Sequence, residues 1–386
     1  MRRAPSTPAC LLLLLGLIAS GCTKPVHPGD PISGLTREQL DRFRRGRAVF
    51  DTVFTPERGL GPLFNAAACG ECHENPVSGA FGDEIEVHAT AFHPDGNCDP
   101  LAAEGGPVIQ QNATPALKAA LGIDKEPSPK DATALAHRSS PAIFGRGLLD
   151  AVPDSDIVSY ADPDDRNHDG ISGRVNRFVD GRVGRFGRKA FVPALDEFNA
   201  GAFVIEMGVT NPAVPTEESI GGDSIPQGVD PTPEPEINQE ALDLTNDFVR
   251  FLAPPSPLRQ NGAAGRGRRL FDRIGCASCH FPTLRTGKNA VRALDRKKFF
   301  AYTDLLLHDM GPDLADICLG LATPSEFRTE PLVGVRLAKH FLHDGRADSL
   351  EQAIELHGGE GSGARDRFKA LEPKDRKALL AFLKTL

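Results

Sequence analysis

The chain has 386 residues, of which 40% are hydrophobic and 25% are charged, and its formal net charge at pH 7 is -8. This length is sufficient for two domains with packed cores. Because the charge balance is mildly acidic and no basic run stands out, we expect no nucleic-acid partner.

The N-terminus has the layout of a bacterial export signal. Two arginines precede a short apolar run over 11–18, which is too short to span a bilayer. The run ends in the letters ASGC, a lipobox-like pattern that closes at Cys22. We therefore expect 1–21 to be a lipoprotein signal peptide, 22–34 to be a tether, and Cys22 to carry acyl chains. Thr23 rather than Asp favours a lipid-anchored periplasmic protein on the outer membrane. A plain secretory signal with an incidental cysteine is the alternative.

Two CxxCH motifs stand in the chain, namely Cys69-Gly-Glu-Cys72-His73 and Cys276-Ala-Ser-Cys279-His280. In such a motif the two cysteines add to the vinyl groups of haem, and the histidine becomes the proximal iron ligand. A zinc site is the main alternative, but each pair would then need two further cysteine or histidine ligands at short spacing. We therefore predict two covalently bound haem c groups.

A similar pattern surrounds each motif. GRAVFD at 46–51 precedes the first CxxCH, and GRRLFD at 267–272 precedes the second. Each half then closes on an apolar helix, expected around 248–252 and at 379–386. A helix before the haem site and a helix at the end form the minimal frame of a cytochrome c domain.

These repeats predict a mainly α fold with two cytochrome c-like domains and long irregular loops. We expect an N-terminal haem domain over 35–256 and a C-terminal haem domain over 257–386. Residues 75–140 are rich in Gly, Pro and Asp with little periodicity, and 211–237 are rich in Pro. The first stretch is expected to be irregular, and the second is expected to be a surface loop or a flexible excursion.

Two cysteines, Cys98 and Cys318, remain once the signal, the expected lipid site at Cys22 and the CxxCH motifs are set aside. In an oxidising compartment they could form a disulfide between the two halves of the chain. Two unrelated thiols are an equally good interpretation, because the sequence does not give the separation of their Cα atoms.

The sixth iron ligand decides whether a haem transfers electrons or meets a substrate. Met310 follows the second motif within the same half and is favoured as the ligand there, with His308 as its competitor. For the first motif the candidates are weaker, and they are Met207, His88 and His93.

A calcium loop is a further candidate. Asp165, Asn167 and Asp169 fall at the first, third and fifth positions of an EF-hand-like loop, and Gly170 falls at the sixth. The twelfth position is Asn176 instead of the usual Glu. The pattern is compatible with one bound calcium ion, and a plain turn rich in Asp and Asn is the alternative.

With these residues in view, the chain resembles the di-haem oxidoreductases, a branch of the bacterial di-haem cytochrome c peroxidase superfamily also labelled thiol oxidoreductases. The resemblance extends from about 46 to 386. The segments that carry it are GRFGRKA (184–190), FVIEMGVTNP (203–212), YTDLLLHDMGPDLAD (302–316), EFRTEPLVGV (326–335) and FLHDGRADSLEQAIELHGGEG (341–361).

The resemblance implies a division of labour between the haems. The C-terminal haem would take electrons from a small redox protein, and the N-terminal haem would meet peroxide or another small oxidant. Glu206 would act as the acid–base group beside the N-terminal haem. Arg188 stands where relatives commonly carry Trp, and the chain has no Trp. Superfamily members often hold calcium near the domain interface.

The sequence therefore leaves two functional interpretations open. The first is a peroxidase-like oxidoreductase, and the second is an electron-transfer cytochrome without catalysis. A purely structural lipoprotein is a weaker third interpretation, because two haems would then have no purpose.

Overall fold

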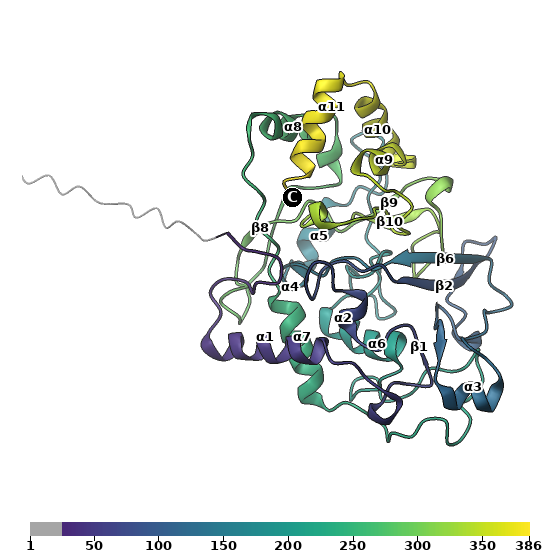
Figure 1. Cartoon of the computed structure of the whole chain (residues 1–386). Helices are drawn as coiled ribbons and strands as arrows, with labels where there is room; N and C mark the ends of the chain where they lie inside the picture. Colours follow the sequence, from purple (N-terminus) through teal and green to yellow (C-terminus); the bar gives the residue numbers. More distant parts are fainter. Residues whose placement is uncertain (1–24) are drawn as a thin grey trace, which may run out of the picture.

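The computed structural model describes residues 25–386. The expected signal peptide over 1–21 and the expected lipid site at Cys22 lie outside the described residues. Figure 1 shows one helical group at the bottom, around α1 and α7, and another at the top, around α8 to α11, with the strands β2 and β6 between them. Within the described residues, no helix is long and apolar enough to cross a membrane.

The first helix pair consists of α1 (Arg37–Phe50) and α7 (Gln239–Phe251), which pack against each other. Gly46 lies where they cross. A Cβ atom there would lie 1.9 Å from the backbone oxygen of Leu244 and 3.0 Å from Cβ of Phe248, so only glycine permits this approach. The first helix of the predicted haem frame therefore exists and is fixed by its glycine.

The second helix pair repeats this arrangement. Helix α8 (Gly262–Arg273) packs against α11 (Pro373–Leu383). A Cβ atom on Gly267 would lie 1.9 Å from the backbone oxygen of Ala378 and 2.8 Å from Cβ of Phe382. The glycines of the two GR-x-x-FD segments thus permit a close helix crossing in each half.

More of the described residues lie in helices than in strands. The remaining helices are α2 (Cys69–Cys72), α3 (Pro115–Leu121), α4 (Arg146–Asp150), α5 (Asp154–Tyr160), α6 (Leu195–Met207), α9 (Leu350–Glu355) and α10 (Ser362–Lys369). The strands are β1 (Leu63–Phe64), β2 (Ile85–Phe92), β3 (Cys98–Asp99), β4 (Val108–Ile109), β5 (Asn112–Ala113), β6 (Ala134–Ser139), β7 (Thr283–Arg285), β8 (Lys298–Phe300), β9 (Leu307–Asp309) and β10 (Glu326–Arg328).

The stretch 75–140 is not the irregular loop that its composition predicts. It contains a four-stranded antiparallel sheet, in which β3, β2 and β4 are neighbours in that order and β6 also pairs with β2. The register places Val87 opposite His137 and Ile85 opposite Ser139. The prediction was wrong because the longest pairing, between β2 and β6, joins residues that are well separated along the chain, which local periodicity does not reveal. The Pro-rich stretch 211–237 forms no helix or strand, as predicted.

The segment expected as a tether is docked from Val26 onward. The backbone N–H of Ile32 donates to the oxygen of Phe251 at 2.8 Å, and the N–H of Ser256 donates to the oxygen of Val26 at 2.9 Å. The side chain of Ile32 is buried in the core around α1 and α7. This segment therefore lies along the chain that leads from α7 to α8.

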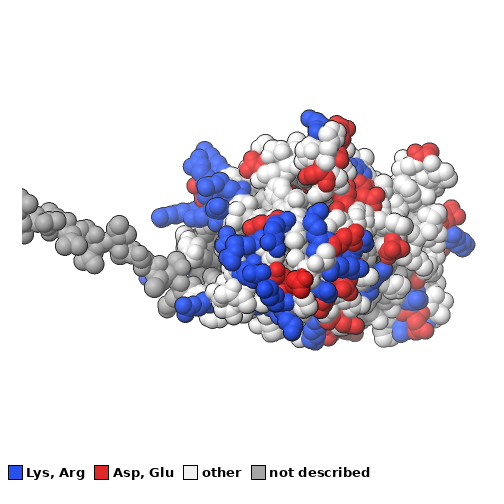
Figure 2. All heavy atoms as spheres, turned by 90° about the horizontal axis from the view of Figure 1, so that it is seen from above, with Lys and Arg blue, Asp and Glu red and all other residues white. Residues whose placement is uncertain are grey.

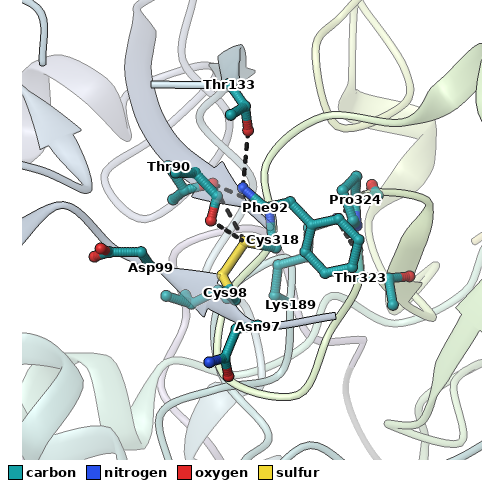
Figure 3. The surroundings of a disulfide bond; sticks show 12 residues. Thr90, Phe92, Asn97, Cys98, Asp99, Thr133, Lys189, Cys318, Thr323 and Pro324 are labelled. Carbon is teal, nitrogen blue, oxygen red and sulfur yellow. Dashed lines mark hydrogen bonds between the residues drawn. A yellow bond between two sulfur atoms is a disulfide. The ribbon is translucent and has the colours of Figure 1, made fainter. Parts of the chain in front are cut away.

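A disulfide joins the two halves. Cys98 of β3 is bonded to Cys318, with their Cα atoms 5.8 Å apart. Figure 3 shows the bond beside Thr90, whose hydroxyl oxygen accepts a hydrogen bond from the backbone N–H of Cys318 at 3.2 Å. The structure therefore decides between the two interpretations of these cysteines in favour of a bond.

Replacing Gly267 with alanine should lower the free energy of unfolding by about 1–3 kcal/mol, because the new methyl group would force α8 away from α11. At Gly265 in the same helix, an added methyl group would have no neighbouring atom within 4 Å, so Gly265→Ala should raise stability by up to about 1 kcal/mol. Urea denaturation of both variants measures the difference. Equal effects of the two substitutions would contradict the close crossing.

Removing the disulfide with the double substitution Cys98→Ser and Cys318→Ser should cost about 2–5 kcal/mol, because the unfolded chain loses a cross-link over 220 residues. Denaturation of the wild-type protein with and without a reductant measures the same quantity. If the reductant leaves the unfolding curve of the wild-type protein unchanged, the bond is absent.

Candidate haem sites

The first CxxCH motif lies on a short helix next to the α1–α7 pair. Cys69 and Cys72 bound α2, and His73 follows at its end. The Nδ1 atom of His73 lies 3.3 Å from the backbone oxygen of Ala80, and the ring of Phe50 lies 6.1 Å away, centroid to centroid. Burial lowers the pKa of His73. A neutral imidazole with Nδ1 held by a carbonyl leaves Nε2 free for a metal.

The second motif has the same arrangement. Its first three residues form a 3-10 turn, Cys276–Ser278, directly after α8. The Nδ1 atom of His280 lies 2.9 Å from the backbone oxygen of Tyr302, and the ring of Phe271 lies 6.4 Å away. Burial lowers the pKa of His280 to about 4 and raises the pKa of Cys276 to about 12. Both CxxCH histidines are therefore neutral at pH 7 and available as ligands.

The zinc alternative finds little support. Among the described residues, no cluster of possible metal ligands includes the cysteines of the first motif. At the second motif, Cys279 groups with Asp304 and His308. However, the two ring nitrogens of His308 lie 2.8 Å from Asp304 and 2.6 Å from Glu360. Although burial alone would lower the pKa of His308, its bonds to these groups raise it to about 12. Both ring nitrogens of His308 are thus engaged by carboxylates in this structure.

A cavity of about 480 Å³ lies beside the second motif. This volume is within the range of cofactor sites. Its wall includes Cys276, His280 and the expected ligand Met310. It extends to Asn75 and Phe81, which follow the first motif in the sequence. The space and the residue types therefore fit a haem at the second motif.

The cavity has a second candidate for the sixth ligand that the sequence did not suggest. His357 lines it together with Met310, and both side chains lie next to Gly361. The Nδ1 atom of His357 is 2.7 Å from the backbone oxygen of Ala353, and burial lowers the pKa of His357. It thus repeats the arrangement of the two CxxCH histidines. The sequence signal that could have indicated His357 as a ligand is its place in the HGGEG segment (357–361).

The weaker candidates for the first motif have other roles. Met207 is fully buried in an apolar cluster with Phe203. The Nε2 atom of His88 lies 3.1 Å from a carboxylate oxygen of Glu86 on the same strand. His93 is exposed at the end of that sheet. Met207 and His88 are therefore engaged elsewhere, and the sixth ligand of the first motif stays a prediction.

Glu206 lies on α6 and is joined to the segment that leads into the first motif. Its backbone oxygen accepts from the N–H of Asn65 at 2.7 Å, and its side-chain Oε2 accepts from Nδ2 of the same residue at 2.8 Å. Burial, and then the negative charge of Glu86, raise the pKa of Glu206 well above its ordinary value. Glu206 is therefore a half-buried carboxyl group with a raised pKa, next to the segment that leads into the first motif.

The expected calcium loop is held by its own hydrogen bonds. A carboxylate oxygen of Asp165 accepts from the backbone N–H groups of Asp169 and Gly170 at 3.0 and 3.2 Å. Asn176 is fully buried, and its amide donates to two backbone carbonyls and accepts from two backbone N–H groups. The amide of Asn176 is therefore already engaged by the backbone, whereas the sequence predicted it as the twelfth-position ligand of the calcium loop. Among the described residues, four carboxylates whose oxygens lie within 4.8 Å of one another are found elsewhere, at Glu217, Asp230, Glu234 and Glu236.

Comparison with known families decides the class of protein. Residues 127–386 match the family described as "Di-haem oxidoreductase, putative peroxidase". The chain belongs to this family. It is thus a peroxidase-like oxidoreductase, and the family implies two haem cofactors and an oxidant as substrate. The matched region contains Glu206, the second motif and Met310, whereas the first motif precedes it.

No curated protein matches the chain. Among solved structures, hydrazine synthase from Kuenenia stuttgartiensis is 14% identical, with 99% of this chain and 100% of that chain covered and a TM-score of 0.41. A MauG-like protein associated with microbial copper homeostasis is 16% identical, with 94% and 92% covered and a TM-score of 0.40. The di-haem peroxidase BthA from Burkholderia thailandensis is 15% identical, with 94% and 93% covered and a TM-score of 0.39.

Proposed function

We propose that this protein is an exported di-haem cytochrome c that reduces peroxide at its N-terminal haem. Its haem domains would span 35–256 and 257–386, with covalent attachment at the two CxxCH motifs. The observation that carries the proposal is Glu206, a half-buried carboxyl group with a raised pKa, which is hydrogen-bonded to Asn65 in the segment that enters the first motif.

Glu206 supplies the proton chemistry in this proposal. Reduction of hydrogen peroxide consumes two electrons and two protons and yields two molecules of water. A haem held at Cys69, Cys72 and His73 would supply the electrons that cleavage of the O–O bond requires. Glu206 takes the proton from the near oxygen and returns it to the far oxygen, which leaves as water. Asn65 orients the carboxyl group through its hydrogen bond to Oε2.

Electrons would enter through the C-terminal haem from a small redox protein. Figure 2, which views the molecule from the top of Figure 1, shows Lys and Arg gathered over this part of the surface, with acidic residues between them. Exposed basic side chains of α8 and α11 contribute, among them Arg268, Arg269, Lys374 and Lys377. Although the whole chain is acidic, this face would attract an acidic donor.

Two observations support export to the periplasm. Haem c is normally attached outside the cytoplasm, and the disulfide between Cys98 and Cys318 belongs to an oxidising compartment. A lipid anchor at Cys22 would hold the protein on the outer membrane. Release of a Cys22→Ala variant into the soluble periplasmic fraction tests the anchor.

A calcium ion at Asp165, Asn167 and Asp169 is part of the same proposal. Metal analysis of the haem-loaded protein after exhaustive dialysis tests it, and a protein free of calcium would contradict it.

Glu206→Gln should lower kcat/KM for hydrogen peroxide by a factor of about 10²–10⁴ because the amide cannot relay a proton. The optical spectra of both haems should stay unchanged. Glu197→Gln is the matched control, since Glu197 lies on the exposed side of the same helix and pairs with Arg182. Steady-state peroxide assays and EPR of the ferric and semi-reduced states should be run on one sample. Two low-spin haems in both states without turnover would leave only an electron carrier.

The sixth ligand at the second motif is the other open assignment. We propose His357 in preference to Met310, because its Nδ1 is fixed by a carbonyl as in the CxxCH histidines. His357→Leu should therefore alter the EPR signal and optical spectrum of one haem, and Met310→Leu should alter neither. Loss of a methionine–iron charge-transfer band in the Met310→Leu variant would instead restore Met310 as the ligand.

A further inference from the structure

Three arginines from separate parts of the chain line the cavity next to the second motif. They are Arg146 at the start of α4, Arg188 in the GRFGRKA segment, and Arg328 at the end of β10. Their side chains are 8%, 14% and 2% exposed. Burial of three guanidinium groups in one wall is costly unless anions compensate them.

The three arginines share one carboxylate, Glu330. Nη2 of Arg146 lies 2.9 Å from it, Nη2 of Arg328 lies 2.6 Å from it, and Nη1 of Arg188 lies 3.2 Å from it. Their other hydrogen bonds go to backbone oxygens of Ala142, Ser139 and Gly187. Nη1 of Arg328 is buried and has no hydrogen-bond partner among the described residues. Three positive charges thus meet one negative charge, and one donor is free.

Neighbouring charges do not balance this surplus. Glu86 attracts Arg188 from a distance, but its carboxylate is already bound to His88. Desolvation, together with repulsion by the other two arginines, lowers the pKa of Arg328 to about 10 although Glu330 opposes the shift. Since the guanidinium stays charged at pH 7, the arrangement calls for at least one further anion in the cavity.

The cluster lies between the two CxxCH motifs. Arg146 is near enough to His73 for its charge to act on that imidazole. On the other side, the negative charge of Asp304 attracts the guanidinium of Arg328. Asp304 is in turn bonded to His308, which lies next to Cys279 of the second motif. The cavity that the arginines line also contains His280. An anion bound here would therefore belong to a group that is seated beside one of the motifs.

We propose that Arg146, Arg188 and Arg328 form a receptor for the propionate carboxylates of haem, and that their surplus positive charge raises the reduction potential of the haem they hold. Arginine is suited to this role because its planar fork binds carboxylates by paired hydrogen bonds. A positive charge nearby favours the ferrous form, which carries one negative charge more than the ferric form. The inference rests on the proposed presence of haem but does not depend on peroxide turnover.

The test compares two substitutions of opposite sign in the full haem-loaded protein. Arg328→Gln removes a positive charge and should shift the reduction equilibrium of one haem about tenfold toward the ferric form, a fall of about 59 mV for a one-electron couple. Glu330→Gln removes the negative charge and should raise the same potential. Spectroelectrochemical titration measures both midpoint potentials without any activity assay.

Three controls sharpen the test. Arg328→Lys keeps the charge and should keep most of the potential, although it loses the paired hydrogen bonds. Arg182→Gln removes an exposed arginine paired with Glu197 and should leave both potentials unchanged. Arg188→Gln repeats the main test at a less buried position, in case the Arg328→Gln variant does not fold.

Unchanged potentials in both the Arg328→Gln and Glu330→Gln variants would overturn the inference, as would shifts in the same direction. Potentials that depend on added acetate would mean that the cavity binds a free carboxylate instead of a propionate. Opposite shifts without peroxide turnover would uphold the inference and defeat the proposed peroxidase function, so the two outcomes are separable.

Discussion

The close crossing of two helices in each half is the constraint on which the haem sites depend. At Gly46 and Gly267, the backbones approach so closely that a methyl group would overlap a carbonyl oxygen of the opposing helix. Each glycine lies one turn before a phenylalanine that packs beside a CxxCH histidine, Phe50 in one half and Phe271 in the other. If a helix moved outward, the ring that supports the histidine would move with it. The orientation of each CxxCH histidine therefore depends on the close packing of the helix pair beside it.

Buried charge holds the two halves together around these frames. The ammonium group of Lys189 is fully buried, donates to backbone oxygens of three residues in the second half, and lies 2.8 Å from Asp316. Asp316 also receives two hydrogen bonds from Arg138 on β6. Figure 3 places Lys189 close to the disulfide between Cys98 and Cys318. Because breaking a buried pair leaves an uncompensated charge, this contact fixes how the halves meet.

The GRFGRKA segment (184–190) makes contacts in the fold that its sequence does not predict. The segment carries an arginine at 188, where relatives commonly carry Trp, and the chain has no Trp. In the structure, Arg188 and Lys189 point to two different anionic groups, Glu330 and Asp316, in the second half of the chain. A short basic segment thus serves both the contact between halves and the wall of the cavity. Neither use could be inferred from the segment itself, because both partners lie more than a hundred positions further along.

The sequence alone determined the features whose physics is local. A CxxCH motif places two thiols and an imidazole within one turn, and the helices on either side follow from their spacing of apolar residues. The tertiary structure decided the rest. It paired β2 with β6, joined Cys98 to Cys318, seated Glu206 beside Asn65, brought His357 into the cavity, and gathered three arginines around Glu330. These contacts link residues distant in the chain, and their free energy depends on burial and on opposing charges, which no local pattern of residues encodes.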